Sequence, residues 1–127
     1  METNEEYQLK IKKIAAKSNY HEELFYVVFA GLDEARKKYK TPTHITGQEL
    51  CEGIKIFVKK TYGVMGRHIL ETWGAKTTRD FGEIIYLMIE NNLMGKSNSD
   101  SLNDFNDVYG FATFDIMEVT EKIDWKL

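Results

Sequence analysis

The sequence has a single cysteine and no long apolar run, and each of these two shortages excludes a class of protein. Its single cysteine, Cys51, cannot form an internal disulfide, and a structural zinc site would need more ligands. No apolar stretch approaches the roughly 20 residues that a membrane-spanning helix needs. The first ten residues, METNEEYQLK, are polar and acidic, unlike a secretory signal peptide. We therefore expect a soluble protein of a reducing compartment, the bacterial cytoplasm, that makes no contact with a membrane.

The apolar and aromatic content is that of a folded domain. Hydrophobic residues make up 43% of the 127 positions, with seven Tyr, seven Phe and two Trp. That is enough to build a single buried core. We predict one domain over residues 1–127. Its core is expected at about 19–114, with a polar N-terminal helix at 4–16 and a C-terminal tail at 115–127.

Apolar residues recur at helical spacing in four further segments. The most apolar of them contains Phe81, Ile84, Ile85 and Met88 along one face, and we expect other helices to pack against it. The four predicted helices are Tyr20–Tyr39, Thr46–Tyr62, Val64–Trp73 and Thr77–Leu93.

The connections between these helices leave room for some β structure. Thr46 and Glu49 fit a capping box that starts the second of the four helices. The single proline, Pro42, lies in the loop before it, where Thr43–Ile45 could form a very short strand. Residues 94–114 begin polar and end in VYGFATF, which could form a small β-hairpin. The sequence thus predicts a mainly α, compact domain of four or five helices, winged-helix-like if residues 94–114 form that hairpin.

Charge is distributed unevenly along the chain, although the net charge is only −3. Residues 36–67 carry a net charge of +6, whereas residues 77–127 carry −6. Solvated helix faces and helix dipoles account for part of this pattern, because cations are favourable near helix C-termini. It also predicts a surface, here called the basic band, that could contact phosphate or an acidic partner. The basic band consists of Arg36, Lys37, Lys38, Lys40, Lys55, Lys59, Lys60 and Arg67.

The tripeptide Asp80-Phe81-Gly82 spells the DFG motif of protein kinases. The glycine-rich loop, the strand lysine and the H-R-D loop of a kinase are missing. Asp80 is therefore interpreted as a residue of a first helical turn, and Gly82 as a point of close packing.

No other catalytic or metal-binding arrangement is recognisable. The nearest base to Cys51 in sequence is His44, and we interpret this cysteine as a buried apolar residue. His68 and Glu71 are i, i+3 neighbours, but two ligands do not make a metal site. The sequence predicts no catalytic residue, no metal and no cofactor, and an enzyme is the weaker expectation.

Three blocks of the chain resemble a known family. They read HITGQELCEGIK, ETWGAKTTRDFGEIIYLMIENNLM and SLNDFNDVYGF, within residues 19–111. They are similar to the Minf-type bacterial family, some members of which are described as repeat proteins. Cys51 stands where the family usually has leucine, which favours a buried apolar role. The resemblance implies one independently folding unit and carries over no activity, substrate or catalytic residue.

Two functions follow as hypotheses. We expect a non-catalytic protein-interaction or regulatory module, which binds a protein partner or itself through exposed apolar residues and its uneven charge. The alternative is a winged-helix-like RNA- or DNA-binding protein that uses the basic band at residues 36–67 for backbone contacts. Tyr39 and Tyr62 within that band could stack on unpaired bases or close their helices onto the core. The acidic helix predicted after Thr77 would repel phosphates, so base reading by it is not expected.

Overall fold

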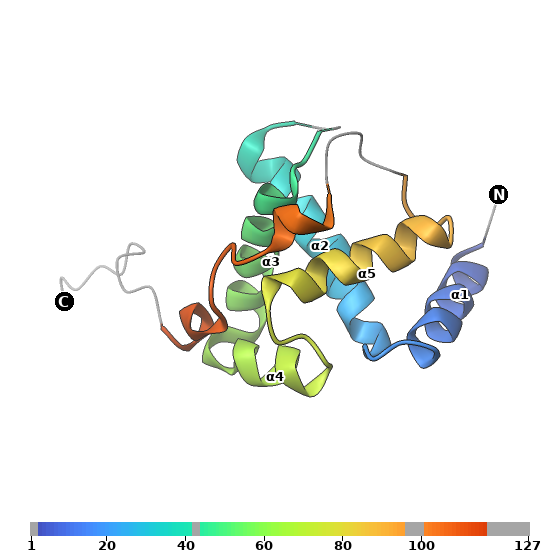
Figure 1. Ribbon diagram of the computed structural model, residues 1–127, viewed down its shortest axis with the longest axis horizontal. Coiled ribbons are helices and arrows are strands. Elements are labelled where there is room, and N and C mark those ends of the chain that lie inside the picture. The colour runs from blue at the N-terminus through green and yellow to red at the C-terminus, as the bar shows by residue number, and fades with distance from the viewer. Residues whose placement is uncertain (1–2, 42–43, 96–100, 117–127) are drawn as a thin grey trace, which may run out of the picture.

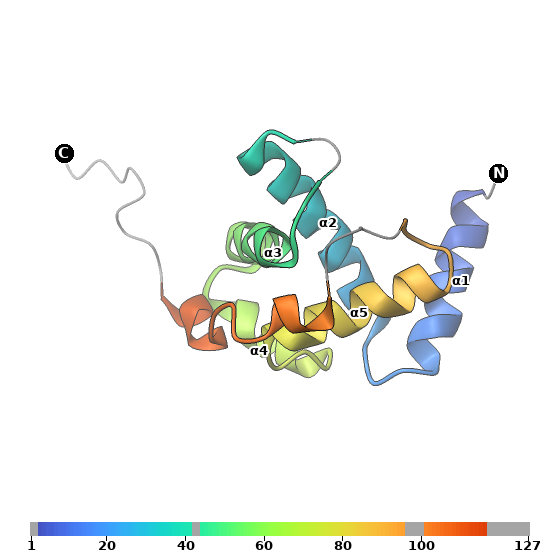
Figure 2. The same ribbon diagram turned by 45° about the horizontal axis from the view of Figure 1, so that its top comes forward.

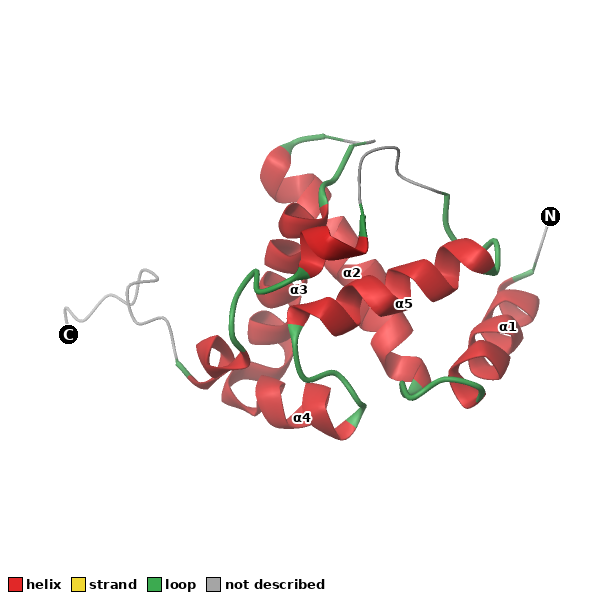
Figure 3. Ribbon diagram, viewed as in Figure 1, coloured by secondary structure: helices red, strands yellow, loops and turns green. Residues whose placement is uncertain are grey.

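The computed structural model describes residues 3–41, 44–95 and 101–116, and within these ranges the chain is mainly helical and contains no strand (Figure 3). The prediction of a mainly α fold is confirmed. The α-helices are α1 (Asn4–Ala16), α2 (Glu22–Tyr39), α3 (Gly47–Tyr62), α4 (Gly66–Thr72) and α5 (Thr78–Glu90). The 3-10 helices are η1 (Gly63–Met65), η2 (Leu102–Phe105) and η3 (Phe111–Asp115).

Local capping sets where the helices begin. The predicted capping box at α3 is present, with the Thr46 hydroxyl accepting the Glu49 N–H and the Glu49 carboxylate accepting the Thr46 N–H. The same arrangement at Thr3 starts α1. At α5 the Asp80 carboxylate accepts the N–H groups of Lys76 and Thr77, at 2.8 and 3.0 Å. Each cap satisfies backbone donors that a first helical turn leaves without a partner.

The closest packing in the domain is between α2 and α3, which cross at its centre (Figure 1). Two glycines, Gly31 of α2 and Gly53 of α3, allow this approach. A Cβ at Gly31 would lie 2.8 Å from the Cα of Ile54, and one at Gly53 would lie 2.8 Å from the Cβ of Ala35. Because no side chain stands between them, the two helix backbones touch directly.

Helix α5 lies across this pair, and α1 packs at the far end of α2 (Figures 1 and 2). The closest partner of α5 is η2. Phe105 of η2 lies over Gly82 of α5, and a Cβ added at Gly82 would be 2.6 Å from the phenyl ring. This agrees with the interpretation of Gly82 as a point of close packing. The most apolar helix therefore covers the α2–α3 pair, which is the centre of the domain.

The segment predicted as a wing forms two 3-10 helices, η2 and η3, joined by a loop over residues 106–110. Phe111 and Phe114 are both buried, and their rings meet edge to face at 5.3 Å. A strand would send residues three apart to opposite faces, whereas a 3-10 helix returns them to the same face. Burial of both rings therefore favours η3, and the winged-helix hairpin expected at residues 94–114 is not supported.

Two smaller predictions involve residues beyond the described ranges. Residues 96–100 of the expected hairpin and Thr43 of the expected short strand lie outside them, and His44 and Ile45 form no strand. The expected tail at 115–127 falls inside the described residues only at Asp115, the last residue of η3, and at Ile116.

Candidate functional site

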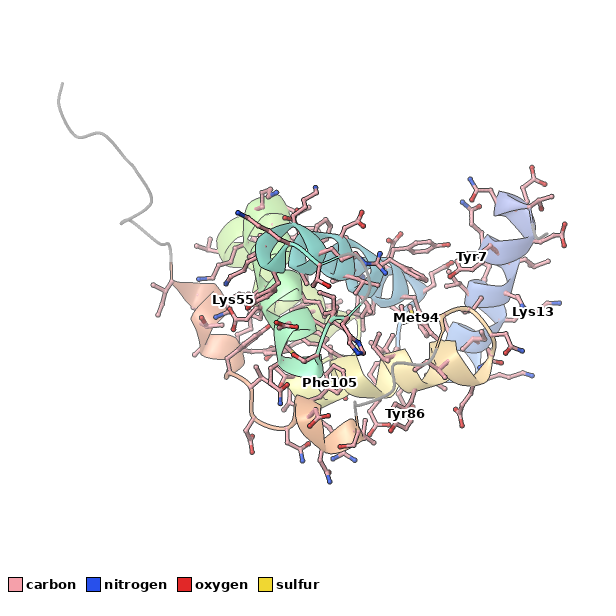
Figure 4. All side chains as sticks on the ribbon, turned by 90° about the horizontal axis from the view of Figure 1, so that it is seen from above. Tyr7, Lys13, Lys55, Tyr86, Met94 and Phe105 are labelled. Atoms are coloured by element: carbon pink, nitrogen blue, oxygen red, sulfur yellow. The ribbon has the colours of Figure 1, made fainter. Side chains whose placement is uncertain are left out.

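The structure brings half of the basic band together at one groove, which has a volume of about 570 Å³. The groove lies along the face of α3 that points away from the core, and η1 and η3 supply its other wall. Figure 4 shows Lys55, at its edge, at the opposite end of the molecule from Tyr7 and Lys13 of α1. The ten residues that line it, here called the lysine groove, are Lys38, Glu52, Lys55, Ile56, Lys59, Lys60, Gly63, Val64, Phe114 and Ile116.

Helical spacing explains how α3 contributes five of these residues, and Gly63, the first residue of η1, continues the same line. Positions 52, 55, 56, 59, 60 and 63 recur at three- and four-residue intervals, so they form one stripe. The opposite stripe carries Leu50, Ile54 and Val58, which are buried in the core. The outward stripe mixes lysines with Ile56 instead of being wholly polar.

Carboxylates pair with Lys38, Lys55 and Lys60 of the groove. Glu52 Oε1 lies 3.4 Å from Lys55 Nζ and 4.0 Å from Lys38 Nζ, and Glu34 of α2 lies 2.8 Å from Lys60 Nζ. These pairs are solvated, so each contributes at most about 1 kcal/mol to stability. Glu52 is the one acidic residue in the lining, and the lysine groove keeps a net charge of +3.

Lys55 is positioned further by an aromatic ring. Its ammonium lies 4.6 Å from the ring centroid of Tyr109, within the range of a cation–π interaction. The Tyr109 hydroxyl donates a 2.7 Å hydrogen bond to the carbonyl oxygen of Cys51. These two contacts join the loop after η2 to α3 and fix the position of the Lys55 side chain at the edge of the groove.

Exposed apolar side chains stand beside these charges. Val64 is 52% exposed and Ile116 is 64% exposed, although both are large aliphatic residues. Met65, next to Val64, is 52% exposed as well. Single exposed apolar residues are ordinary, and here two of them lie within one charged groove.

The other members of the basic band lie outside the groove lining. Arg67 donates hydrogen bonds to Glu71 at 3.1 Å and to Asp115 at 2.9 Å, and these bonds raise the pKa of its guanidinium. It thereby joins α4 to η3. The remaining three are exposed near the C-terminal end of α2: Arg36, Lys37 and Lys40.

The two tyrosines of the band close onto the core. Tyr62 meets Phe57 and Trp73 edge to face, with ring centroids 6.1 and 6.0 Å away. Tyr39 is half-buried and packs against the core as well. This geometry favours a structural role for both rings over stacking on unpaired bases.

The residues considered for catalysis do not form a site. Cys51 is fully buried, and burial, with a smaller effect of the charge on Glu52, raises the pKa of its thiol to about 12. His44 is exposed in a loop, and the carboxylate of Glu71 next to His68 is engaged by Arg67. In the described part of the chain, no group of three or more His, Cys, Asp or Glu side chains is placed to hold a metal ion.

The sequence predicted the lysines of the groove but not the apolar residues that line it. Ile56, between Lys55 and Lys59, could have indicated an apolar element of this surface, because an isoleucine on the charged stripe of a helix faces away from the core. Phe114 and Ile116 come from a segment more than 50 positions away, and no local pattern assigns them to this surface.

Comparison of the chain with known protein families, curated proteins and solved structures finds no match. The resemblance to the Minf-type family therefore stays a prediction. None of the helices in the described ranges has the length and apolar character needed to cross a membrane.

Proposed function

We propose that this domain is a non-catalytic protein-interaction module that binds its partner in the lysine groove. The observation that carries the proposal is the exposure of Val64 and Ile116 inside a groove with a net charge of +3. Protein interfaces combine an apolar centre, which supplies most of the binding energy, with charges around it that fix the orientation. The lysine groove has both parts.

A small-molecule site is less well supported by the same groove. Its volume of about 570 Å³ falls in the ordinary range for ligand pockets. Such pockets, however, usually direct a few polar groups inward from an apolar wall. Here the side chains of Lys38 and Lys60 are 46% and 64% exposed, so the charges stand at the edge and face solvent.

Two observations weigh against the alternative, an RNA- or DNA-binding protein. The described part of residues 94–114 offers no hairpin that could act as a wing. Val64 and Ile116 would also gain little from contact with phosphates.

A capture experiment with one groove variant and one matched control tests the proposal. Val64→Asp places a charge at the groove, and Leu9→Asp makes the same change on α1 at an equally exposed position, 53% against 52%. Tagged wild-type and variant proteins are incubated with lysate, with and without nuclease, and the retained proteins are identified. We expect Val64→Asp to lose specific proteins that wild type and Leu9→Asp retain, whether or not nuclease is added.

Two results would contradict the proposal. If both variants retain the same proteins as wild type, the lysine groove is not the binding surface. If nuclease removes everything that wild type retains, the protein is a nucleic-acid-binding protein and not a protein-interaction module.

A further inference from the structure

We infer that the lysine groove takes an acidic amphipathic helix of about 12 residues, a little over three helical turns, from a protein partner. The inference rests on the proposed function and adds the chemistry of the partner. It follows from three features of the groove: its length, the placement of its lysines, and the position of its apolar residues between them.

The length of the groove suits a short helix. Its floor follows α3 from Glu52 to Gly63, which spans about 17 Å at the helical rise of 1.5 Å per residue. A helix laid along this floor presents an apolar side chain on the same face at every third or fourth position. Those side chains would meet Ile56 near the middle of the floor and Val64 and Ile116 at its end.

The lysines stand on both sides of this apolar line. Lys38 belongs to α2, and Lys60 reaches toward α2 because its ammonium pairs with Glu34 there. On the opposite side Lys55 lies over Tyr109, and Lys59 Nζ lies 3.5 Å from the carbonyl oxygen of Ile116. A helix with carboxylates on both flanks of an apolar stripe would therefore meet a lysine on each side.

A second copy of this chain fits the groove less well within the described residues. Helix α1 has the exposed Glu5 and Glu6 but also the exposed Lys12 and Lys13, and α5 carries Glu83, which pairs with Arg79, and Glu90. The one large exposed apolar side chain of α5 is Tyr86, 39% exposed, so this face of α5 has no apolar stripe to fill the groove. The charge and apolar pattern together favour a different protein as the partner.

Removing the charge of Glu52 tests the inference, because it should strengthen the binding of an acidic helix. The Glu52 carboxylate bridges Lys38 and Lys55 where the groove floor begins, and there it would repel the partner's carboxylates and compete for both lysines. Glu52→Gln keeps the shape of the side chain and removes this charge. An acidic helix should bind the Glu52→Gln protein about two- to fivefold more tightly, as expected for one exposed charge contact. An uncharged helix should bind both proteins equally.

The experiment uses defined probes. Fluorescently labelled peptides of about 12 residues carry leucines at the apolar positions of a helix and Glu, Gln or Lys on the flanks, and a scrambled Glu peptide keeps the composition. A single-stranded oligonucleotide serves as a further probe. Binding is measured by anisotropy, and methyl NMR spectra locate the contacts. We expect only the Glu peptide to bind well and to shift the methyl signals of Ile56, Val64 and Ile116.

Matched variants separate specific contacts from overall charge. Lys38→Gln with Lys60→Gln removes two groove charges, and Lys12→Gln with Lys37→Gln removes two exposed charges elsewhere. The first pair should weaken binding of the Glu peptide by about tenfold, and the second pair should have less than a twofold effect. Val64→Asp should abolish binding, whereas Leu9→Asp should leave it unchanged.

Several outcomes would overturn the inference. They are equal binding of the Gln and Glu peptides, stronger binding of the oligonucleotide than of any peptide, or methyl shifts remote from the groove. A wild-type dimer in light scattering that Val64→Asp dissociates would make a second copy the occupant. If the Glu peptide fails while Val64→Asp still loses captured proteins from lysate, the partner has other chemistry and the proposed function stands. If Val64→Asp loses nothing in either assay, both proposals fail.

Discussion

Replacing Gly53 with alanine should force α2 and α3 apart, because these helices touch through their backbones at this position. The added Cβ would meet the carbonyl oxygen of Gly31 and would lie 2.8 Å from both the Cβ and the backbone nitrogen of Ala35. Carbon atoms in ordinary contact are about 3.5–4.0 Å apart. The backbones must therefore separate by about 1 Å, since neither the carbonyl group nor Ala35 can rotate out of the way.

The expected loss of stability follows from opposing effects. Overpacking of a well-packed interior costs about 1–3 kcal/mol, and the upper value applies because backbone atoms resist the change. Alanine favours the helix over glycine by about 1 kcal/mol, which offsets part of that cost. The net destabilisation is about 2 kcal/mol. For a domain of this size it corresponds to a fall in Tm of about 8 °C.

Urea and thermal unfolding followed by circular dichroism measure this change, with Gly110→Ala as the control. No atom lies within 4 Å of a Cβ at Gly110, and its φ of −87° suits any residue. Gly110→Ala should therefore unfold within about 0.5 kcal/mol of wild type, or slightly above it. If Gly53→Ala is as stable as this control, the direct contact between α2 and α3 does not exist as described.

Two further predictions concern buried polar groups. Thr78, fully buried, donates a 2.6 Å hydrogen bond to the Phe105 carbonyl, so Thr78→Val should lower the free energy of unfolding by about 2 kcal/mol. Urea unfolding checks this against the exposed Thr72→Val, and equal midpoints would contradict it. Burial raises the pKa of the Cys51 thiol from its ordinary 9.0 to about 12, so the contribution of this thiol to stability should be constant below pH 9 and fall above it as the thiol of the unfolded chain ionises. The fall approaches about 1.4 kcal/mol per pH unit; Cys51→Ala should show less of it between pH 8 and 10, and an unchanged slope would refute the assignment.

Much of the candidate site was predictable from charge alone. The eight residues of the basic band stand out in the sequence, and the four that line the groove include three on the outward stripe of α3. The i, i+3 pairing of Lys55 with Glu52 is local to α3, whereas the pairing of Lys60 with Glu34 and of Lys55 with Tyr109 was not predictable. It depends on how α2, α3 and the loop after η2 lie against one another, over separations of up to 54 positions.

The helices themselves were determined by the sequence. Their apolar spacing and the capping box at Thr46 and Glu49 involve residues three or four positions apart, so a short stretch of chain contains all the interactions needed. The tertiary structure alone decided the path of residues 101–116. Their aromatic side chains find partners only in distant elements, as Phe105 does over Gly82, and burial of those rings outweighs the local preference of VYGFATF for a strand.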